Sequence, residues 1–212
     1  MKSVICFFFC SILISCAQTP TDYPAHWWAP VSDENAPSWE ILPQMAGPGE
    51  VILSKRNELG ILSNFAATPF IYRGKEYASV EGFWQMMKYA ESQSDPRAIF
   101  KLAHSREEVA QMVAFEAKAA GDAASAEMKK HKIDWVTFEG EKMVYCSTTP
   151  AFHYRLIKDA MWEKVMQNPQ VKKTLLATGD LILRPDHLGG SCQAPEWKYH
   201  ELWMEIRSEL QR

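Results

Sequence analysis

The sequence predicts an α+β fold, a single domain in which helices dominate and the β element is small. Three observations support this prediction. The chain of 212 residues is 47% apolar and 12% aromatic, which is enough for one sizeable core, and it shows no internal repeat. Helix start and stop signals recur from about residue 79 to the C-terminus. The strand-like runs are few, short and local, without regular alternation of strands and helices.

The first residues have the pattern of an export signal. Lys2 supplies a positive charge, residues 4–14 form an apolar run, and the tetrad L-I-S-C ends at Cys16. The run is too short to span a bilayer as a mature helix. The tetrad resembles the lipobox of bacterial lipoproteins, so we expect a signal peptide over residues 1–15 and a lipidated Cys16. An ordinary secretory signal and a signal anchor are the alternatives.

The residues that follow the tetrad indicate where the anchored protein goes. Neither Ala17 nor Gln18 is acidic, which in Gram-negative bacteria resembles the default sorting to the outer membrane. We therefore expect a lipid-anchored protein of the bacterial cell envelope, on its periplasmic or surface side. Two cysteines remain downstream, Cys146 and Cys192, and in an oxidising compartment they either pair or stay as buried free thiols. No cysteine or histidine spacing indicates a metal site.

Residues 16–50 are rich in proline and include three tryptophans. Six prolines between residues 17 and 49 exclude regular helix and favour extended chain, so we expect a tether between the anchor and a domain over residues 51–212. Trp27, Trp28 and Trp39 indicate that part of this tether docks. We favour docking on the domain over docking at the membrane interface.

Short apolar runs beside turn residues predict strands at 51–53, 70–72, 76–78 and 181–183. Capping residues predict helices that begin at Ser79, at Asp95-Pro96 and at the capping box Ser105–Glu108, the last of them ending at Gly121. Further helices are expected over 137–146, 153–166, 168–178 with Gly179 as terminator, and 196–210. A loop over 185–195 joins the last strand to the terminal helix.

The helix that Ser79 begins has an unusually narrow polar stripe. At about 100° per residue, most of its surface is apolar. Only three polar positions, at i, i+4 and i+7, interrupt that surface: Glu81, Gln85 and Lys88. A helix that is apolar on most sides is buried, and a buried charge requires a reason. The alternative interpretation is the solvated edge of an amphipathic helix.

Several motifs, taken in order and spacing, resemble the NADAR or YbiA-like family. They are S-N-F-A-A-x-P-F from Ser63, G-K, S-V-E, Q-x-x-K, A-K-A-A-G, D-W and L-L-A-T-G-D, and the similarity extends from about Val51 to Arg207. The resemblance implies a mainly helical α+β N-glycosidase associated with ADP-ribose and NAD chemistry. It implies removal of ADP-ribose from guanine, or hydrolysis of riboflavin-pathway intermediates, and it requires no redox cofactor.

The resemblance places the family's essential glutamate at Glu81. A carboxylate suits N-glycoside cleavage because an anion stabilises the oxocarbenium-like state and orients the attacking water. The alternative is that Glu81 is only an acidic residue in the first turn of a helix, where the helix dipole favours a negative charge. Lys88, about 10 Å along the helix, matches the family's lysine. We favour substrate binding for Lys88; the alternatives are holding Glu81 ionised, attack on an opened ribose as an amine nucleophile, or a solvated surface lysine.

Other positions in the motifs are candidates for substrate binding. Asn64 and Phe65 suit a polar anchor beside an aromatic platform for a flat base, although phenylalanine is more often a core residue. Trp84 is a weaker candidate, for the wall of the pocket next to Glu81. Trp135, which stands in the D-W motif, is another weaker candidate. For both tryptophans the alternative role is packing in the core. Asp180 either accepts hydrogen bonds from ribose or a base, or caps the turn after its helix.

Two candidates and two departures from the family pattern concern the pocket rim. Arg56 is a candidate phosphate ligand, and Asp186 a candidate for the family's acidic position. Gly82 stands where many members carry histidine, and residues 184–190 include no tryptophan where many members have one. The leaving group of the reaction is therefore left open.

The leading hypothesis is a lipid-anchored N-glycosidase with a small nucleotide-like substrate and with water as acceptor. A non-catalytic lipoprotein that binds a nucleotide-like ligand is the second hypothesis, and a structural envelope protein the third. The formal charge of the chain, −3, and its scattered basic residues argue against a stable nucleic-acid partner.

Overall fold

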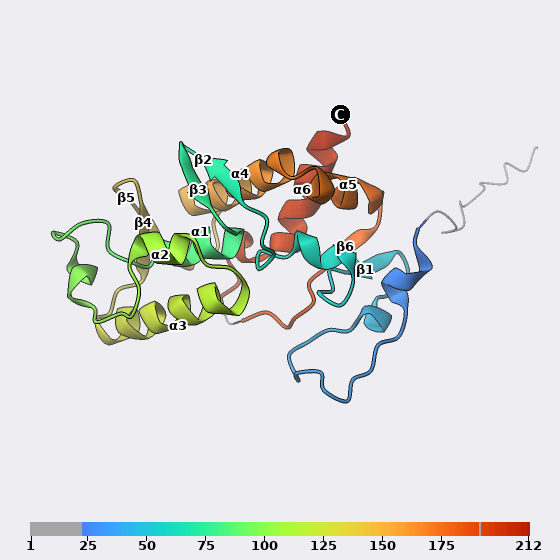
Figure 1. Ribbon diagram of the computed structural model, residues 1–212, viewed down its shortest axis with the longest axis horizontal. Helices are drawn as coiled ribbons and strands as arrows, with labels where there is room; N and C mark the ends of the chain where they lie inside the picture. The colour runs from blue at the N-terminus through green and yellow to red at the C-terminus, as the bar shows by residue number, and fades with distance from the viewer. Residues whose placement is uncertain (1–22, 191) are drawn as a thin grey trace, which may run out of the picture.

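The computed structural model describes residues 23–190 and 192–212, and it confirms the mainly helical α+β fold (Figure 1). The signal peptide and Cys16 lie outside the described residues. Within the described part, no helix combines the length and the apolar character that crossing a membrane requires.

The described residues form six α-helices: α1 (Val80–Met86), α2 (Arg106–Ala110), α3 (Ala114–Lys130), α4 (Phe152–Gln167), α5 (Pro169–Ala177) and α6 (Tyr199–Leu210). Five short 3-10 helices accompany them: η1 (Ala25–Trp28), η2 (Pro43–Met45), η3 (Glu58–Leu62), η4 (Pro96–Ile99) and η5 (Pro195–Trp197). Helices α1 and α4 lie at the centre, with α2 and α3 towards one end and α5 and α6 towards the other (Figure 1).

The strands pair in three separate two-stranded sheets: β1 (Glu50–Ile52) with β6 (Ile182–Arg184), β2 (Phe70–Tyr72) with β3 (Lys75–Tyr77), and β4 (Trp135–Phe138) with β5 (Glu141–Val144). The first pair is parallel and places Val51 beside Leu183, so it joins the start of the domain to the chain after α5. The other two pairs are antiparallel hairpins.

The helix expected over 137–146 is wrong, because the chain forms the β4–β5 hairpin there. Glu139 and Gly140 both have positive φ, 52° and 82°, which is the geometry of a two-residue hairpin turn. The flanking residues Trp135–Phe138 are β-branched or aromatic, a composition that favours strands.

The helix expected from the capping box to Gly121 is two helices. The capping box on Ser105 is present, but α2 ends at Ala110 and α3 begins at Ala114. Gly121 is therefore an interior residue of α3 and does not terminate a helix. Asp95-Pro96 begins only the short 3-10 helix η4.

Helix α1 is buried along its whole length, as its narrow polar stripe predicts. Ser79 caps it, since its Oγ accepts from the backbone N–H of Gly82 at 2.9 Å. Gly82 also allows α1 to approach the end of α2, because a Cβ there would lie 2.6 Å from the Met112 carbonyl oxygen. A larger side chain at this position would not fit this packing.

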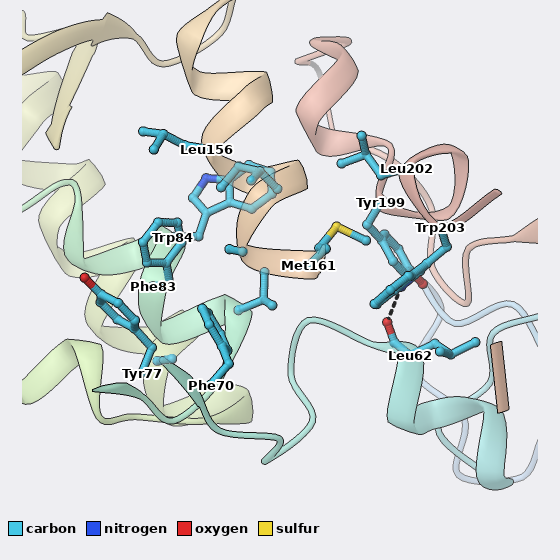
Figure 2. Close-up of a cluster of buried hydrophobic side chains, with 14 of the residues drawn as sticks. Leu62, Phe70, Tyr77, Phe83, Trp84, Leu156, Met161, Tyr199, Leu202 and Trp203 are labelled. Carbon is cyan, nitrogen blue, oxygen red and sulfur yellow. Dashed lines mark hydrogen bonds between the residues drawn. The ribbon is translucent and has the colours of Figure 1, made fainter. Parts of the chain in front are cut away.

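The stretch Leu62–Phe65, which contains the S-N-F motif, is bonded to four different helices. Each of its four carbonyl groups accepts one hydrogen bond from a distant donor: Leu62 from Trp203 Nε1 of α6 at 2.6 Å, Ser63 from Lys164 Nζ of α4 at 2.8 Å, Asn64 from the N–H of Glu81 in α1 at 3.0 Å, and Phe65 from the N–H of Ala114 in α3 at 3.1 Å. Figure 2 shows the first of these bonds beside the aromatic core.

Part of the proline-rich segment packs against the domain. Trp27 is buried in the core, and its indole N–H donates to Glu58 at 2.6 Å. Trp28 donates to the backbone oxygen of Glu50 at 2.8 Å. Trp27 and Trp28 therefore dock on the domain, which is the interpretation that the sequence favours.

Cys146 and Cys192 form a disulfide with their Cα atoms 5.8 Å apart, which decides between the paired and free alternatives. The bond ties the chain after β5 to the chain before η5. A loop of this length, with a sequence separation of 46, corresponds to a stabilisation of about 4 kcal/mol in the chain-entropy account.

Candidate functional site

A cavity of about 750 Å³ opens between α1, α3 and the chain around the two ends of the disulfide. This volume suits a small organic ligand. Its lining residues are Trp39, Lys55, Ser63, Asn64, Phe65, Glu81, Trp84, Gln85, Lys88, Phe115, Lys118, Ala119, Asp122, Ser125, Tyr145, His187, Leu188, Trp197 and Tyr199. The three polar residues of the predicted stripe therefore line one cavity, although α1 ends at Met86 and Lys88 lies just beyond it.

Glu81 is the carboxylate in the inner part of this cavity and is only 6% exposed. Its Oε1 accepts from Gln85 Nε2 at 2.7 Å, while Oε2 makes no hydrogen bond within the described residues. Burial raises the pKa of Glu81 above its ordinary value, and it outweighs the opposing effects of the Gln85 hydrogen bond and the Lys88 charge. Glu81 is thus a carboxylate with one oxygen held and the other available to a ligand.

Lys88 follows the end of α1 and is buried beside α3. Its Nζ donates to Ser125 Oγ at 2.8 Å and to the Gly121 carbonyl oxygen at 3.2 Å, and it lies 4.8 Å from the ring centroid of Tyr145. Burial lowers the pKa of Lys88 to about 8, although the negative charge of Glu81 acts in the opposite direction. At neutral pH the cavity therefore contains an ammonium group whose proton is unusually weakly held.

Gly121 sets the distance between α1 and α3. A Cβ at this position would lie 1.7 Å from Gln85 Oε1 and 2.2 Å from its Cδ. The glycine of the A-K-A-A-G motif therefore makes room for the amide that fixes Glu81. This is the physical reason for a glycine in the middle of α3, where it is otherwise a weak helix former.

Aromatic side chains form the walls of the cavity. Trp84 and Tyr145 each contact Trp197 edge to face, with ring centroids 5.6 Å and 5.2 Å apart. Phe65 and Phe115 also line the cavity and meet edge to face, with ring centroids 5.1 Å apart. Such walls suit a flat ring, since aromatic faces and edges attract one another in these arrangements.

Four buried polar atoms of lining residues make no hydrogen bond within the described residues: Asn64 Oδ1, Gln85 Oε1, Trp84 Nε1 and Trp197 Nε1. An unpaired buried polar atom costs free energy, so it usually has a reason. Two acceptors and two donors in the lining of one cavity are complementary to a polar ligand.

Asp186 lies directly behind the lining residues and organises three of them. It is buried, it forms an ion pair with Lys55, and it accepts from His187 at 2.9 Å and from Tyr199 at 3.3 Å. Burial alone would raise its pKa, but the His187 hydrogen bond and the Lys55 charge hold the pKa of Asp186 below its ordinary value. Asp186 therefore stays ionised and positions a positively charged side chain of the cavity.

Besides Asp186, three more predicted substrate ligands lie outside the cavity lining. Arg56 donates to both carboxylate oxygens of Glu40, at 2.7 and 2.6 Å. The ring of Trp135 contacts two cations, with its centroid 4.6 Å from Arg97 Cζ and 4.0 Å from Lys142 Nζ. We leave Arg56 and Trp135 out of the proposed site.

Asp180 is the third of these residues. Its carboxylate accepts from the hydroxyl of Tyr23, and its backbone N–H donates to the same hydroxyl at 3.1 Å. The residue before it, Gly179, has a φ of 53° and forms the turn that ends α5. These contacts fit the turn-capping role of Asp180 better than a ligand role. We therefore leave Asp180 out of the proposed site as well.

Sequence reasoning missed much of the cavity lining. Tyr145 and Trp197 come from a hairpin end and a 3-10 helix that no motif marked, and Lys55 precedes the first motif. Lys118 lies within A-K-A-A-G, one turn before Asp122 with which it forms an ion pair at 2.6 Å. That motif was the one signal that would have pointed to part of the missing wall.

Comparison with known protein families finds one described as "Bacteriophage protein GP30.3", which matches residues 57–191. No curated protein matches significantly. Among solved structures, the NMR structure of the Escherichia coli protein YbiA is similar at 18% identity, covering 82% of this chain and 89% of that one, with a TM-score of 0.46.

The Gly121–Gln85 contact leads to a stability prediction. Gly121→Ala should lower the free energy of unfolding by about 1–3 kcal/mol, because the new Cβ overlaps the Gln85 amide in a closed interface. In a Gln85→Ala background the same substitution should cost much less, because the overlapping atoms are gone. Urea unfolding of the four proteins measures this coupling.

Gly189→Ala serves as the matched control, because a Cβ at this position meets no atom within 4 Å. It should change the free energy of unfolding by no more than about 0.5 kcal/mol. Equal losses for Gly121→Ala in both backgrounds would show that Gln85 is not what requires the glycine.

Proposed function

This chain belongs to the bacteriophage protein GP30.3 family, which is NADAR/YbiA-like and includes N-glycosidases, and we propose that it hydrolyses the bond between a ribose anomeric carbon and a nitrogen base. The substrate is an ADP-ribose-like, ADP-ribosylated or riboflavin-pathway compound. One observation carries the proposal: Glu81, a buried carboxylate with an unbonded oxygen, lines a cavity walled by aromatic side chains.

In this reaction the C1′–N bond breaks and its electron pair leaves with the nitrogen. The ribose acquires oxocarbenium character, which the negative charge of Glu81 stabilises most strongly at short range and away from bulk water. A water molecule bonds to C1′ through its oxygen, and Glu81 accepts one of its protons. That proton passes to the departing nitrogen, so the net change is addition of water across the bond.

Gln85 and Lys88 support Glu81 in this role. The Gln85 amide fixes one carboxylate oxygen, which leaves the other to face the reacting carbon and water. The Lys88 charge opposes the effect of burial on the pKa of Glu81 and so favours its ionised form. Its ammonium also suits a substrate phosphate, the role favoured from the sequence.

Asn64 and the aromatic walls would hold the base and ribose. Asn64 Oδ1 has no partner among the described residues, and an N–H or O–H of the substrate would satisfy it. Phe65 and Trp84 offer apolar surface to a flat ring. Of the sequence candidates, these three and Lys88 line the cavity, and Asp186 supports it through Lys55.

Replacement of Glu81 tests the catalytic role. Glu81→Gln keeps the shape but removes the charge, so it should lower kcat at least about 100-fold and leave ligand binding largely intact. The measurement is mass spectrometry of the free base released from NAD, ADP-ribose, ADP-ribosylated guanine nucleotides and riboflavin-pathway intermediates. Equal turnover by Glu81→Gln and the parent would contradict a catalytic role for Glu81. No turnover by the parent, with thermal stabilisation by one compound, would support the non-catalytic binding protein.

The pH dependence of kcat/KM should have two limbs. Activity should rise through the pKa of Glu81, which burial places above its ordinary value, and fall near pH 8 as Lys88 loses its proton. Lys88→Met should abolish the alkaline limb and move the acid limb to higher pH, because the charge that favours ionised Glu81 is removed. Lys88→Arg, which keeps a positive charge, should abolish the alkaline limb and leave the acid limb in place. An unchanged alkaline limb in both variants would contradict the assignment.

We also propose that Cys16 carries a lipid anchor and that the enzyme works in the bacterial cell envelope. The L-I-S-C tetrad after the apolar run supports this proposal. Envelope location would direct the enzyme to scavenged nucleotides or to ADP-ribose attached to an envelope or foreign target.

Acyl labelling tests the anchor. The full chain expressed in a bacterium should incorporate labelled fatty acid and sediment with membranes, whereas Cys16→Ser should do neither. Cys6→Ser is the control, because Cys6 falls within the expected signal peptide and should not affect labelling of the mature chain. Membrane sedimentation of Cys16→Ser without an acyl label would contradict the lipoprotein interpretation.

A further inference from the structure

The N-terminal segment is attached to the domain from its first described residue. The hydroxyl of Tyr23 donates to the carboxylate of Asp180 and accepts from the Asp180 backbone N–H at 3.1 Å. Gly179 leaves the space for this contact, because a Cβ there would lie 2.2 Å from the Tyr23 hydroxyl oxygen. Trp27 is buried in the core, and Trp28 bonds to β1. The chain therefore reaches the domain at a fixed point, Tyr23.

This attachment limits the length of the tether in the proposed lipoprotein. Cys16 would carry the anchor, and only six residues, 17–22, separate it from Tyr23. An extended chain advances at most about 3.6 Å per residue, so this stretch reaches about 25 Å at most. A small domain is about 30 Å across. The end of the molecule that carries Tyr23 is therefore the end nearest the lipid.

That end is built from η1, η2, β1 and β6 and is rich in exposed apolar side chains (Figure 1). Residues 39–50 and 182–188 lie side by side in it, joined by the β1–β6 pairing and by the bridge between Glu40 and His187. Together they carry four of the nine large apolar side chains that are exposed among the described residues, and we call these four the apolar patch: Trp39, Met45, Ile182 and Leu188. Such a concentration in two short stretches indicates a binding surface.

The charged groups around the apolar patch are compensated. Three carboxylates occur in the two stretches, and each has a basic partner: Glu40 with Arg56, Asp186 with Lys55, and Glu50 with Arg184. Pairing reduces the repulsion that isolated carboxylates would meet at an anionic lipid surface. Tyr23 and Trp28, both half-buried, add the aromatic residues that are typical of a membrane interface.

From this arrangement we infer that the apolar patch is a docking surface for the lipid bilayer that holds the anchor. The inference rests on the proposed lipid anchor and does not depend on the proposed reaction. Two residues of the patch, Trp39 and Leu188, also line the cavity. Docking therefore fixes the orientation of the cavity, which opens beside the lipid surface.

Methionine oxidation tests the docking. Hydrogen peroxide transfers one oxygen atom to an exposed thioether sulfur and is reduced to water, whereas lipid protects a covered sulfur. The acylated full chain in vesicles of phosphatidylethanolamine and phosphatidylglycerol is compared with Cys16→Ser mixed with the same vesicles. Met45, 63% exposed, should oxidise at least about fivefold more slowly in the acylated chain, the effect of partly burying one such side chain. Met166, 47% exposed and on α4, is the internal reference for both rates.

Ile182→Glu places a charge in the apolar patch and leaves Met45 in place. It should restore Met45 oxidation to the rate of the unanchored chain, while the acyl label remains. Ile71→Glu is the matched control, because Ile71 is also an exposed isoleucine of a short strand, 55% against 48% for Ile182, and lies in β2 outside the patch. It should leave the protection of Met45 unchanged.

Equal Met45 oxidation in the acylated and unanchored chains would overturn the docking surface and keep the anchor. Protection that persists in Ile182→Glu would also overturn it. Protection of unanchored Cys16→Ser that grows with protein concentration would assign the patch to a second copy of the chain instead. Absence of the acyl label would overturn anchor and docking together. Base release, measured on the same samples, reports on the N-glycosidase separately, because neither Met45 nor Ile182 lines the cavity.

Discussion

Hydrogen bonding at Leu62–Phe65 is the constraint on which the rest of the structure depends. Four consecutive carbonyl groups are paired with donors from α6, α4, α1 and α3. A buried carbonyl group without a partner costs about 1–3 kcal/mol, so each donor must reach the same short stretch of chain. The stretch thereby fixes the positions of four helices relative to one another. Ser63, Asn64 and Phe65 line the cavity, so the same bonds that assemble the fold also place its ligand-facing residues.

Charged groups are buried around this stretch at a cost that packing alone does not explain. Lys164 is fully buried, and burial lowers its pKa to about 7, yet its Nζ has a clear structural task in bonding the Ser63 carbonyl oxygen. Glu81 and Lys88 have weaker structural reasons, because an apolar pair would fill the same space more favourably. Their exposure to a common cavity, with Gly121 making room for Gln85 between them, is the arrangement expected of a functional site.

The sequence predicted those features whose signals are local. Helix α1, its cap at Ser79 and the cavity-facing stripe follow from spacing within ten residues. The β4–β5 hairpin was missed because Glu139 adopts positive φ, which a glutamate seldom signals. The sequence predicts a helix terminator at Gly121 because the side chain that requires this glycine, Gln85, lies on another helix. Arg56 was assigned to a ligand because its partner, Glu40, is a long-range contact that no pattern reveals.

The electrostatics of the cavity suit a reaction in which positive charge develops. Burial raises the pKa of Glu81 and lowers that of Lys88, so it opposes the ionised form of both. The ionised form of Glu81 is favoured first by the Gln85 hydrogen bond and then by the charge of Lys88, and the ionised form of Lys88 is favoured first by the charge of Glu81. In the reaction that we propose, a ribose that gains oxocarbenium character would supply a second positive charge near Glu81 and favour the carboxylate further. An anionic group of the substrate would do the same for the ammonium of Lys88. Substrate and transition state therefore stabilise the ionised pair that the fold by itself holds only weakly, so the interaction energy is greatest when the bond breaks.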